Sequence, residues 1–131
     1  MTYTGSDDLT VALADGVLSV TLNRPDSLNS LSQGMLELLG DAVLQAATDP
    51  AVKVVRLGGA GRGFCSGAGL SSEDQDAKTF DEAAVLNAAN RAVAALVSLP
   101  KPAVAVVQGV AAGVGVSLAL GCDIVLASEK S

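Results

Sequence analysis

The sequence predicts an α/β fold with a largely parallel sheet, because strand-like and helix-like segments alternate along its 131 residues. Two apolar runs typical of strands, at 52–57 and 103–107, each lead into a glycine-rich turn. Segments whose apolar residues recur at helical spacing separate the runs, and parallel strands need such crossovers. We therefore expect the order β-β-α-β-α-β-α-β within one domain that covers residues 1–131.

The N-terminal part begins with an expected β-hairpin. Strand-like runs at 9–13 and 17–22 flank Ala14-Asp-Gly16, which contains a dipeptide typical of two-residue hairpin turns. The pattern Ser30-Leu-Ser-Gln33 is typical of a capping box and predicts the start of a helix with one apolar face. Thr48-Asp-Pro50 ends that helix before the first of the two apolar runs.

The remaining elements are predicted by a second set of start and stop signals. A capping box at Thr79-Phe-Asp-Glu82 opens an alanine-rich helix that continues to Leu99, where Pro100 ends it. A short buried helix is expected at 114–120, and residues 123–127 have the composition of a fifth strand.

Composition and charge exclude several classes of function. The formal net charge is −6 and the eight basic residues are scattered, which disfavours nucleic acid as a partner. We expect no membrane span, because no stretch of 18 or more residues is purely apolar, and a cytoplasmic location, because the N-terminus lacks the features of a signal peptide. The chain has no histidine, which removes Ser-His and Cys-His nucleophiles and most zinc sites. We expect Cys65 and Cys122 to be small buried side chains and expect no metal site.

The two glycine-rich turns, at 58–69 and 109–115, are the strongest indication of function. Glycine allows close approach of the backbone, so two turns at strand ends can direct two N–H groups at one developing oxyanion. The second turn also has the spacing of a dinucleotide phosphate loop. That alternative is disfavoured, because only 16 residues follow Gly115 and the only tyrosine is Tyr3, so no Tyr-x-x-x-Lys pair is present.

Four segments, taken in order and with their spacing, resemble the crotonase superfamily, which is the enoyl-CoA hydratase/isomerase family. The segments are 22–31, 63–70, 101–115 and 118–123, and the resemblance runs from about Val11 to the C-terminus. It implies a crotonase-like fold of repeated ββα units. It also implies that the C-terminal part of that fold, about half, is missing here, so we expect this sequence to be a fragment of a longer chain.

The resemblance implies an acyl-CoA thioester as substrate, with coenzyme A as part of the substrate and no separate cofactor. The family motif places the two catalytic oxyanion donors at the backbone amides of Ala68 and Val114, where they would stabilise an enolate. The substrate-binding residues that it implies are Leu28, Asn29, Ser66, Ala68, Gly69, Leu70, Ser71, Gly113, Val114 and Ser117. It further implies a homotrimer or a dimer of trimers.

Departures from the family pattern leave the reaction open. Ser117 stands where the hydratases carry a catalytic glutamate, Val114 replaces a usual glycine, and Gly69 replaces a frequent aspartate. Hydration needs a group that activates water, and an unperturbed serine is a poor base. We therefore expect an enolate-forming enzyme, an enoyl-CoA isomerase or a hydratase-like member. The alternative is a non-catalytic CoA-binding or truncated module.

Overall fold

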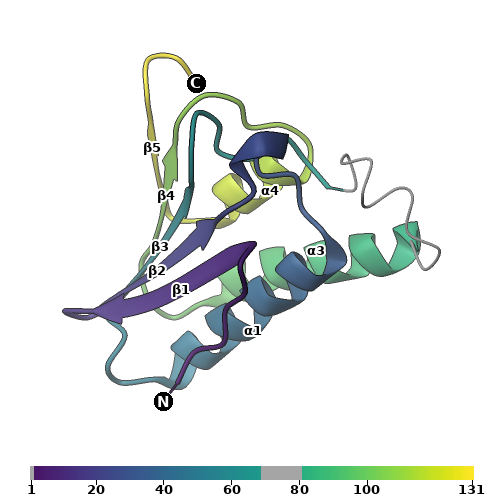
Figure 1. Cartoon of the computed structure of the whole chain (residues 1–131). Helices are drawn as coiled ribbons and strands as arrows, with labels where there is room; N and C mark the ends of the chain where they lie inside the picture. Colours follow the sequence, from purple (N-terminus) through teal and green to yellow (C-terminus); the bar gives the residue numbers. More distant parts are fainter. Residues whose placement is uncertain (1, 69–80) are drawn as a thin grey trace.

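The computed structural model describes residues 2–68 and 81–131, and within them it has the predicted α/β order (Figure 1). A single five-stranded sheet has its strands in the order β1-β2-β3-β4-β5, with β1 antiparallel to β2 and every later pair parallel. The strands are β1 (Leu9–Ala14), β2 (Val17–Leu22), β3 (Val54–Gly59), β4 (Ala103–Val107) and β5 (Ile124–Ala127). The helices are η1 (Pro25–Ser27), α1 (Gln33–Thr48), α3 (Glu82–Ser98) and α4 (Val114–Gly121).

The N-terminal hairpin forms where the sequence predicts it. Ala14 pairs with Val17, so Asp15 and Gly16 alone make the loop. Their φ angles of 51° and 82° are those of a turn that matches the twist of the flanking strands. Local turn chemistry therefore sets the register of the first two strands.

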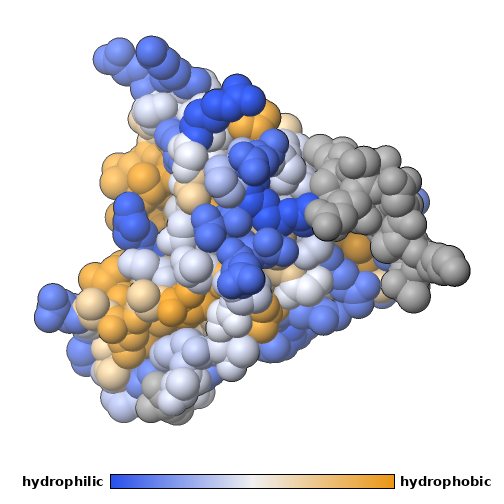
Figure 2. Space-filling model, in the orientation of Figure 1, coloured by the Kyte–Doolittle hydropathy of each residue, from blue (hydrophilic) through white to orange (hydrophobic). Residues whose placement is uncertain are grey.

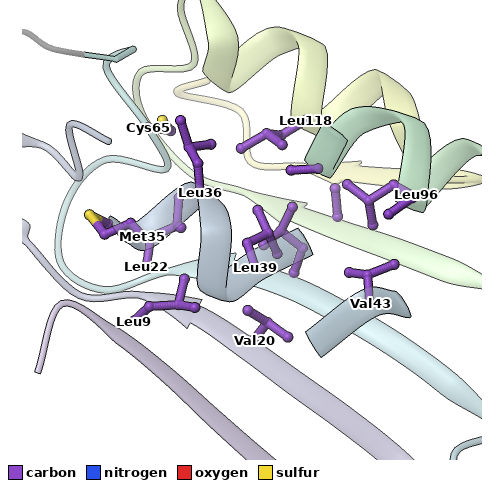
Figure 3. Packing of buried hydrophobic residues seen from close by; sticks show 14 of the residues in the cluster. Leu9, Val20, Leu22, Met35, Leu36, Leu39, Val43, Cys65, Leu96 and Leu118 are labelled. Atoms are coloured by element: carbon purple, nitrogen blue, oxygen red, sulfur yellow. The ribbon is translucent and has the colours of Figure 1, made fainter. Parts of the chain in front are cut away.

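The core lies between the sheet and the helices α1 and α3, which cover one face of it (Figure 1). Alternate residues of β2, among them Val20 and Leu22, are fully buried beneath Leu39 and Val43 of α1, as Figure 3 shows. The buried positions of α3 are mostly alanine, which allows close packing of α1 against α3. This packing supports β3 and β4, and the two glycine-rich turns begin where these strands end.

Both predicted capping boxes are placed too early. Ser32, not Ser30, is the N-cap of α1, and its hydroxyl oxygen accepts a hydrogen bond from the Met35 N–H at 3.2 Å. Residues 28–31 are not available to the helix, because they pair with another segment described below. Asp81 caps α3, while Thr79 of the predicted box lies outside the described residues.

The C-terminal elements leave an apolar surface. The prediction that α4 is a buried helix holds for only one side of it, since Leu118 is buried while Leu120 is 72% exposed. Every residue of β5 is exposed, and Figure 2 shows apolar side chains gathered over β4 and β5. Within the two described ranges, no helix is long and apolar enough to cross a membrane.

A polar cluster fastens the end of α1 that lies away from the glycine turns. The Asp49 carboxylate accepts hydrogen bonds from the Ala51 N–H at 2.9 Å and the Tyr3 hydroxyl at 2.8 Å. The Lys101 ammonium donates to the backbone carbonyl of Ala46 in the last turn of the helix and to that of Asp49, its C-cap residue. The Ala51 N–H, followed by the Tyr3 hydroxyl, holds the pKa of Asp49 below its usual value, while burial raises the pKa of Tyr3 to about 12.

We expect the Asp49→Asn variant to be less stable than the native protein at pH 7, and the difference to shrink in acid. The folded-state pKa of Asp49 is lowered, so its contribution is complete above the unfolded-state pKa and is lost as the pH falls through the folded-state value. Melting temperatures measured from pH 7 to pH 3 test this, with Tyr3→Phe as a control that removes one hydrogen bond and no carboxylate. An equal difference at both ends of the range would contradict it.

Candidate functional site

The first glycine turn ends in a short extended stretch, residues 64–68, and the second turn lies against this stretch. On one side this stretch pairs with the turn that follows β2. The Ser66 N–H donates to the Leu28 carbonyl at 2.9 Å, and the Leu31 N–H donates to the Gly67 carbonyl at 2.7 Å. The chain between β2 and α1 is therefore used as a partner strand for the first turn.

On its other side, the same stretch pairs with the second turn. The Cys65 N–H donates to the Val110 carbonyl at 3.1 Å, and the Ala112 N–H donates to the Cys65 carbonyl at 3.0 Å. Backbone pairing thus joins three segments that are distant in the sequence, and it does so at the edge where β3 and β4 end.

The two turns approach each other closely at positions where the second turn carries glycine. A β-carbon at Gly115 would lie 2.7 Å from the Cys65 carbonyl oxygen, a distance that real β-carbons do not reach. A β-carbon at Gly113 would lie 3.8 Å from the α-carbon of Gly67, which is ordinary contact, and Gly113 has a φ of 54° that favours glycine. Gly67 and Gly113 each immediately precede one of the two predicted donors.

Both predicted donor amides are without an acceptor in the described part of the chain. Val114 is the first residue of α4, so its N–H has no partner within the helix. Ala68 forms a parallel bridge with Leu31, in which Leu31 makes the hydrogen bond and the Ala68 N–H points away from it. Ala68 and Val114 are both half-buried at this edge of the sheet.

The predicted coenzyme A contacts on the chain after β2 have structural partners of their own. The Asn29 side chain is fully buried and its carboxamide binds backbone groups of this chain. Leu28 is half-buried with a φ of 53°, and the Ser66 hydroxyl donates to the Ser27 carbonyl at 3.0 Å. Whether Leu28, Asn29 and Ser66 also contact a ligand stays a prediction.

The other predicted site residues divide into two groups. Ser117 is exposed on α4, one turn after Val114, and Gly113 is exposed at the start of that helix. Gly69, Leu70 and Ser71 lie outside the described residues. Lys101 lies away from the turns, because it precedes β4 and binds the end of α1.

Cys65 is not a nucleophile at neutral pH in this fold. Its side chain is fully buried in the hydrophobic core (Figure 3), and burial raises the pKa of its thiol to about 11. The thiol therefore stays protonated, and only the thiolate attacks or binds a metal. Cys122 is also a free thiol, so the cysteines form no disulfide.

Sequence reasoning missed Gln108, which binds the first glycine turn. Its side-chain nitrogen donates to the Gly59 carbonyl at 2.6 Å and the Gly61 carbonyl at 3.1 Å. The available signal was an amide side chain placed directly after β4 and before Gly109. Its target carbonyls are nearly 50 positions away in the sequence, so only the folded chain reveals the contact.

Comparison with known proteins defines the class to which this arrangement belongs. A model of the enoyl-CoA hydratase/isomerase family matches residues 13–131, and the chain belongs to that family. The fold is the crotonase fold. A solved enoyl-CoA hydratase from Mycobacterium avium subsp. paratuberculosis is 57% identical with a TM-score of 0.85, over 97% of this chain and 49% of that one.

Curated relatives with named reactions are also similar. The 1,2-epoxyphenylacetyl-CoA isomerase of Escherichia coli is 40% identical over 88% of this chain and 45% of its own length. The 2,3-dehydroadipyl-CoA hydratase of Escherichia coli is 38% identical over 95% of this chain and 48% of its own length. The chain thus spans about half the length of the curated relatives that it matches.

We expect Gly115→Ala to destabilise the protein by about 1–3 kcal/mol, because the new methyl group forces the two turns apart at Cys65. Gly34→Ala is the matched control, since the nearest atom to its new β-carbon is 4.0 Å away and alanine favours a helix. Free energies of unfolding from urea titrations compare the two variants. Equal stabilities would show that the crossing of the turns is not tightly packed.

Proposed function

We propose that the carbonyl oxygen of an acyl-CoA thioester binds between the amides of Ala68 and Val114, and that these amides stabilise the enolate formed from it. The observation that carries this proposal is the proximity of Gly67 and Gly113, each followed by an N–H without an acceptor in the described residues. As charge moves onto the thioester oxygen, preorganised donors hold it at no reorganisation cost, and each is worth about 3–4 kcal/mol in the transition state.

Two further features support a thioester as the ligand. The relatives named above act on substrates whose printed names are CoA thioesters. The first turn of α4 also directs its positive end toward the same point as the Val114 N–H, which favours a developing negative charge. Leu28, Asn29 and Ser66 would then face the coenzyme A portion.

The reaction that we propose is an enolate-forming one, an isomerisation or a hydratase-like step. Ser117 supplies no carboxylate on the exposed side of α4 near Val114. The second candidate is therefore a CoA-binding module without turnover. Incubation with 2-enoyl-CoA and 3-enoyl-CoA series separates the two, since hydration or double-bond migration excludes the module, and binding without conversion supports it.

Proline at position 114 tests the proposed donor directly. We expect Val114→Pro to remove the N–H and keep α4, because proline is well accepted at the first position of a helix. The infrared band of a ¹³C-labelled thioester carbonyl should move to lower frequency on binding, and the proline variant should lose about half of that movement, since one of two donors is gone. Val114→Ala keeps the N–H and should behave as the native protein. A proline variant with the full band shift would remove Val114 from the site.

A carboxylate at position 117 tests the role of the glutamate that Ser117 replaces relative to the hydratases of the family. Ser117 and Val114 are three residues apart and share one face of α4, so Ser117→Glu brings a carboxylate close to the proposed oxygen site. A general acid–base group contributes about 100-fold or more, so we expect this variant to hydrate 2-enoyl-CoA faster than Ser117→Gln. Product formation followed by chromatography compares the two, and equal rates would contradict the expectation.

A further inference from the structure

Asn29 makes three hydrogen bonds with its buried carboxamide, and two of them hold the first glycine turn. Its side-chain oxygen accepts from the Arg24 N–H at 2.8 Å. Its nitrogen donates to the Ala60 carbonyl at 2.9 Å and to the Gly63 carbonyl at 2.8 Å. The side chain therefore joins the chain after β2 to the chain after β3 through direct contacts.

Gln108 approaches the same turn from a third segment. Besides its bonds to Gly59 and Gly61, its nitrogen lies 3.4 Å from the Gly63 carbonyl oxygen, which Asn29 also binds. Two carboxamides from different elements thus meet at one carbonyl. We call Asn29 and Gln108 the amide pair.

Hydrogen-bond satisfaction alone does not account for the amide pair. Gly61 is exposed and Gly59 and Ala60 are half-buried, so solvent can reach this part of the turn and supply donors to its carbonyls, whereas Gly63 is buried and its carbonyl is bound by the side chains. A fixed side chain differs from water in one respect, because it sets the direction of each peptide plane. The amide pair therefore satisfies the buried Gly63 carbonyl and also constrains the geometry of the exposed residues before it.

The backbone at Leu28 and Asn29 has an unusual conformation that also brings the chain after β2 against the first glycine turn. Leu28 and Asn29 have φ angles of 53° and 56°, in the left-handed region that leucine rarely adopts. This conformation presents the Leu28 carbonyl to the Ser66 N–H. Backbone strain of this kind persists only where surrounding contacts impose it, and it gathers at functional sites.

We propose that Asn29 and Gln108 are positioning residues that direct the Ala68 N–H toward the Val114 N–H. They fix the carbonyls up to Gly63, the residue from which the stretch 64–68 begins. The orientation of the Ala68 peptide follows from the position of Gly63 and from the backbone pairing of the stretch 64–68 with the chain after β2 and with the second turn. This inference rests on the proposed function, because it assigns the amide pair to the same oxygen site.

Two variants and one control separate positioning from stability. Asn29→Asp keeps the shape and the acceptor but removes both donors, and Gln108→Met removes the donor from a half-buried side chain without adding charge. Asn90→Asp, on the exposed side of α3, is the matched control. If Asn29→Asp does not fold, Gln108→Met carries the test alone.

The first measurement needs no ligand. In ¹H–¹⁵N spectra, we expect the Ala68 amide to change its chemical shift and hydrogen exchange in both variants, while the Val114 amide and the whole control spectrum stay native. An unchanged Ala68 amide in Gln108→Met overturns the inference, whatever the protein binds.

The second measurement uses a saturated acyl-CoA with a ¹³C-labelled thioester carbonyl, and coenzyme A as a reference ligand. We expect Gln108→Met to lose about half of the bound carbonyl shift, because one of two donors is displaced, and to bind coenzyme A as tightly as the native protein. A full carbonyl shift, or an equal loss of affinity for both ligands, overturns the inference. A native protein that produces no shift contradicts the proposed function, and the amide spectra then decide the positioning role separately.

Discussion

The arrangement depends on one steric constraint, the close packing of the two glycine turns at a point where Gly115 carries no side chain. The Cys65 carbonyl lies so close to Gly115 that a β-carbon there would overlap it. This contact sets the start of α4 against the stretch 64–68, and the pairing of Cys65 with Val110 and Ala112 follows from it. The two N–H groups proposed to bind an oxyanion belong to Ala68, three residues after Cys65, and to Val114, directly before Gly115, so their relative position depends on the same contact.

The two ends of the sheet have different physical roles. Where β3 and β4 end, the contacts are glycine backbone, pairing of short segments and the amide pair, and ligands of open α/β sheets bind at this edge. At the opposite end, Tyr3, Asp49 and Lys101 fasten the last turn of α1 with charged and buried groups. Substitutions at the second end should alter stability, whereas substitutions at the first should alter binding as well.

The proposed site would supply charge stabilisation, and its described residues include no evident group for proton transfer. Cys65 stays protonated because burial raises the pKa of its thiol, and the hydroxyl of Ser117 is by itself a poor base. Backbone donors tolerate side-chain replacement, so the proposed role of Val114 does not require a glycine at that position. The relatives include both an isomerase and a hydratase by name, so similarity to them leaves the reaction open.

The sequence by itself determined the elements that depend on neighbouring residues, such as the hairpin at Asp15-Gly16 and the strand Ala103–Val107. Its motifs also identified the family and both glycine turns. It placed the start of α1 at Ser30 instead of Ser32 and missed the contacts of Gln108, because these depend on partners distant in the chain. Only the tertiary structure brought Gly67 against Gly113, since pairing between separate segments decides which turns can meet.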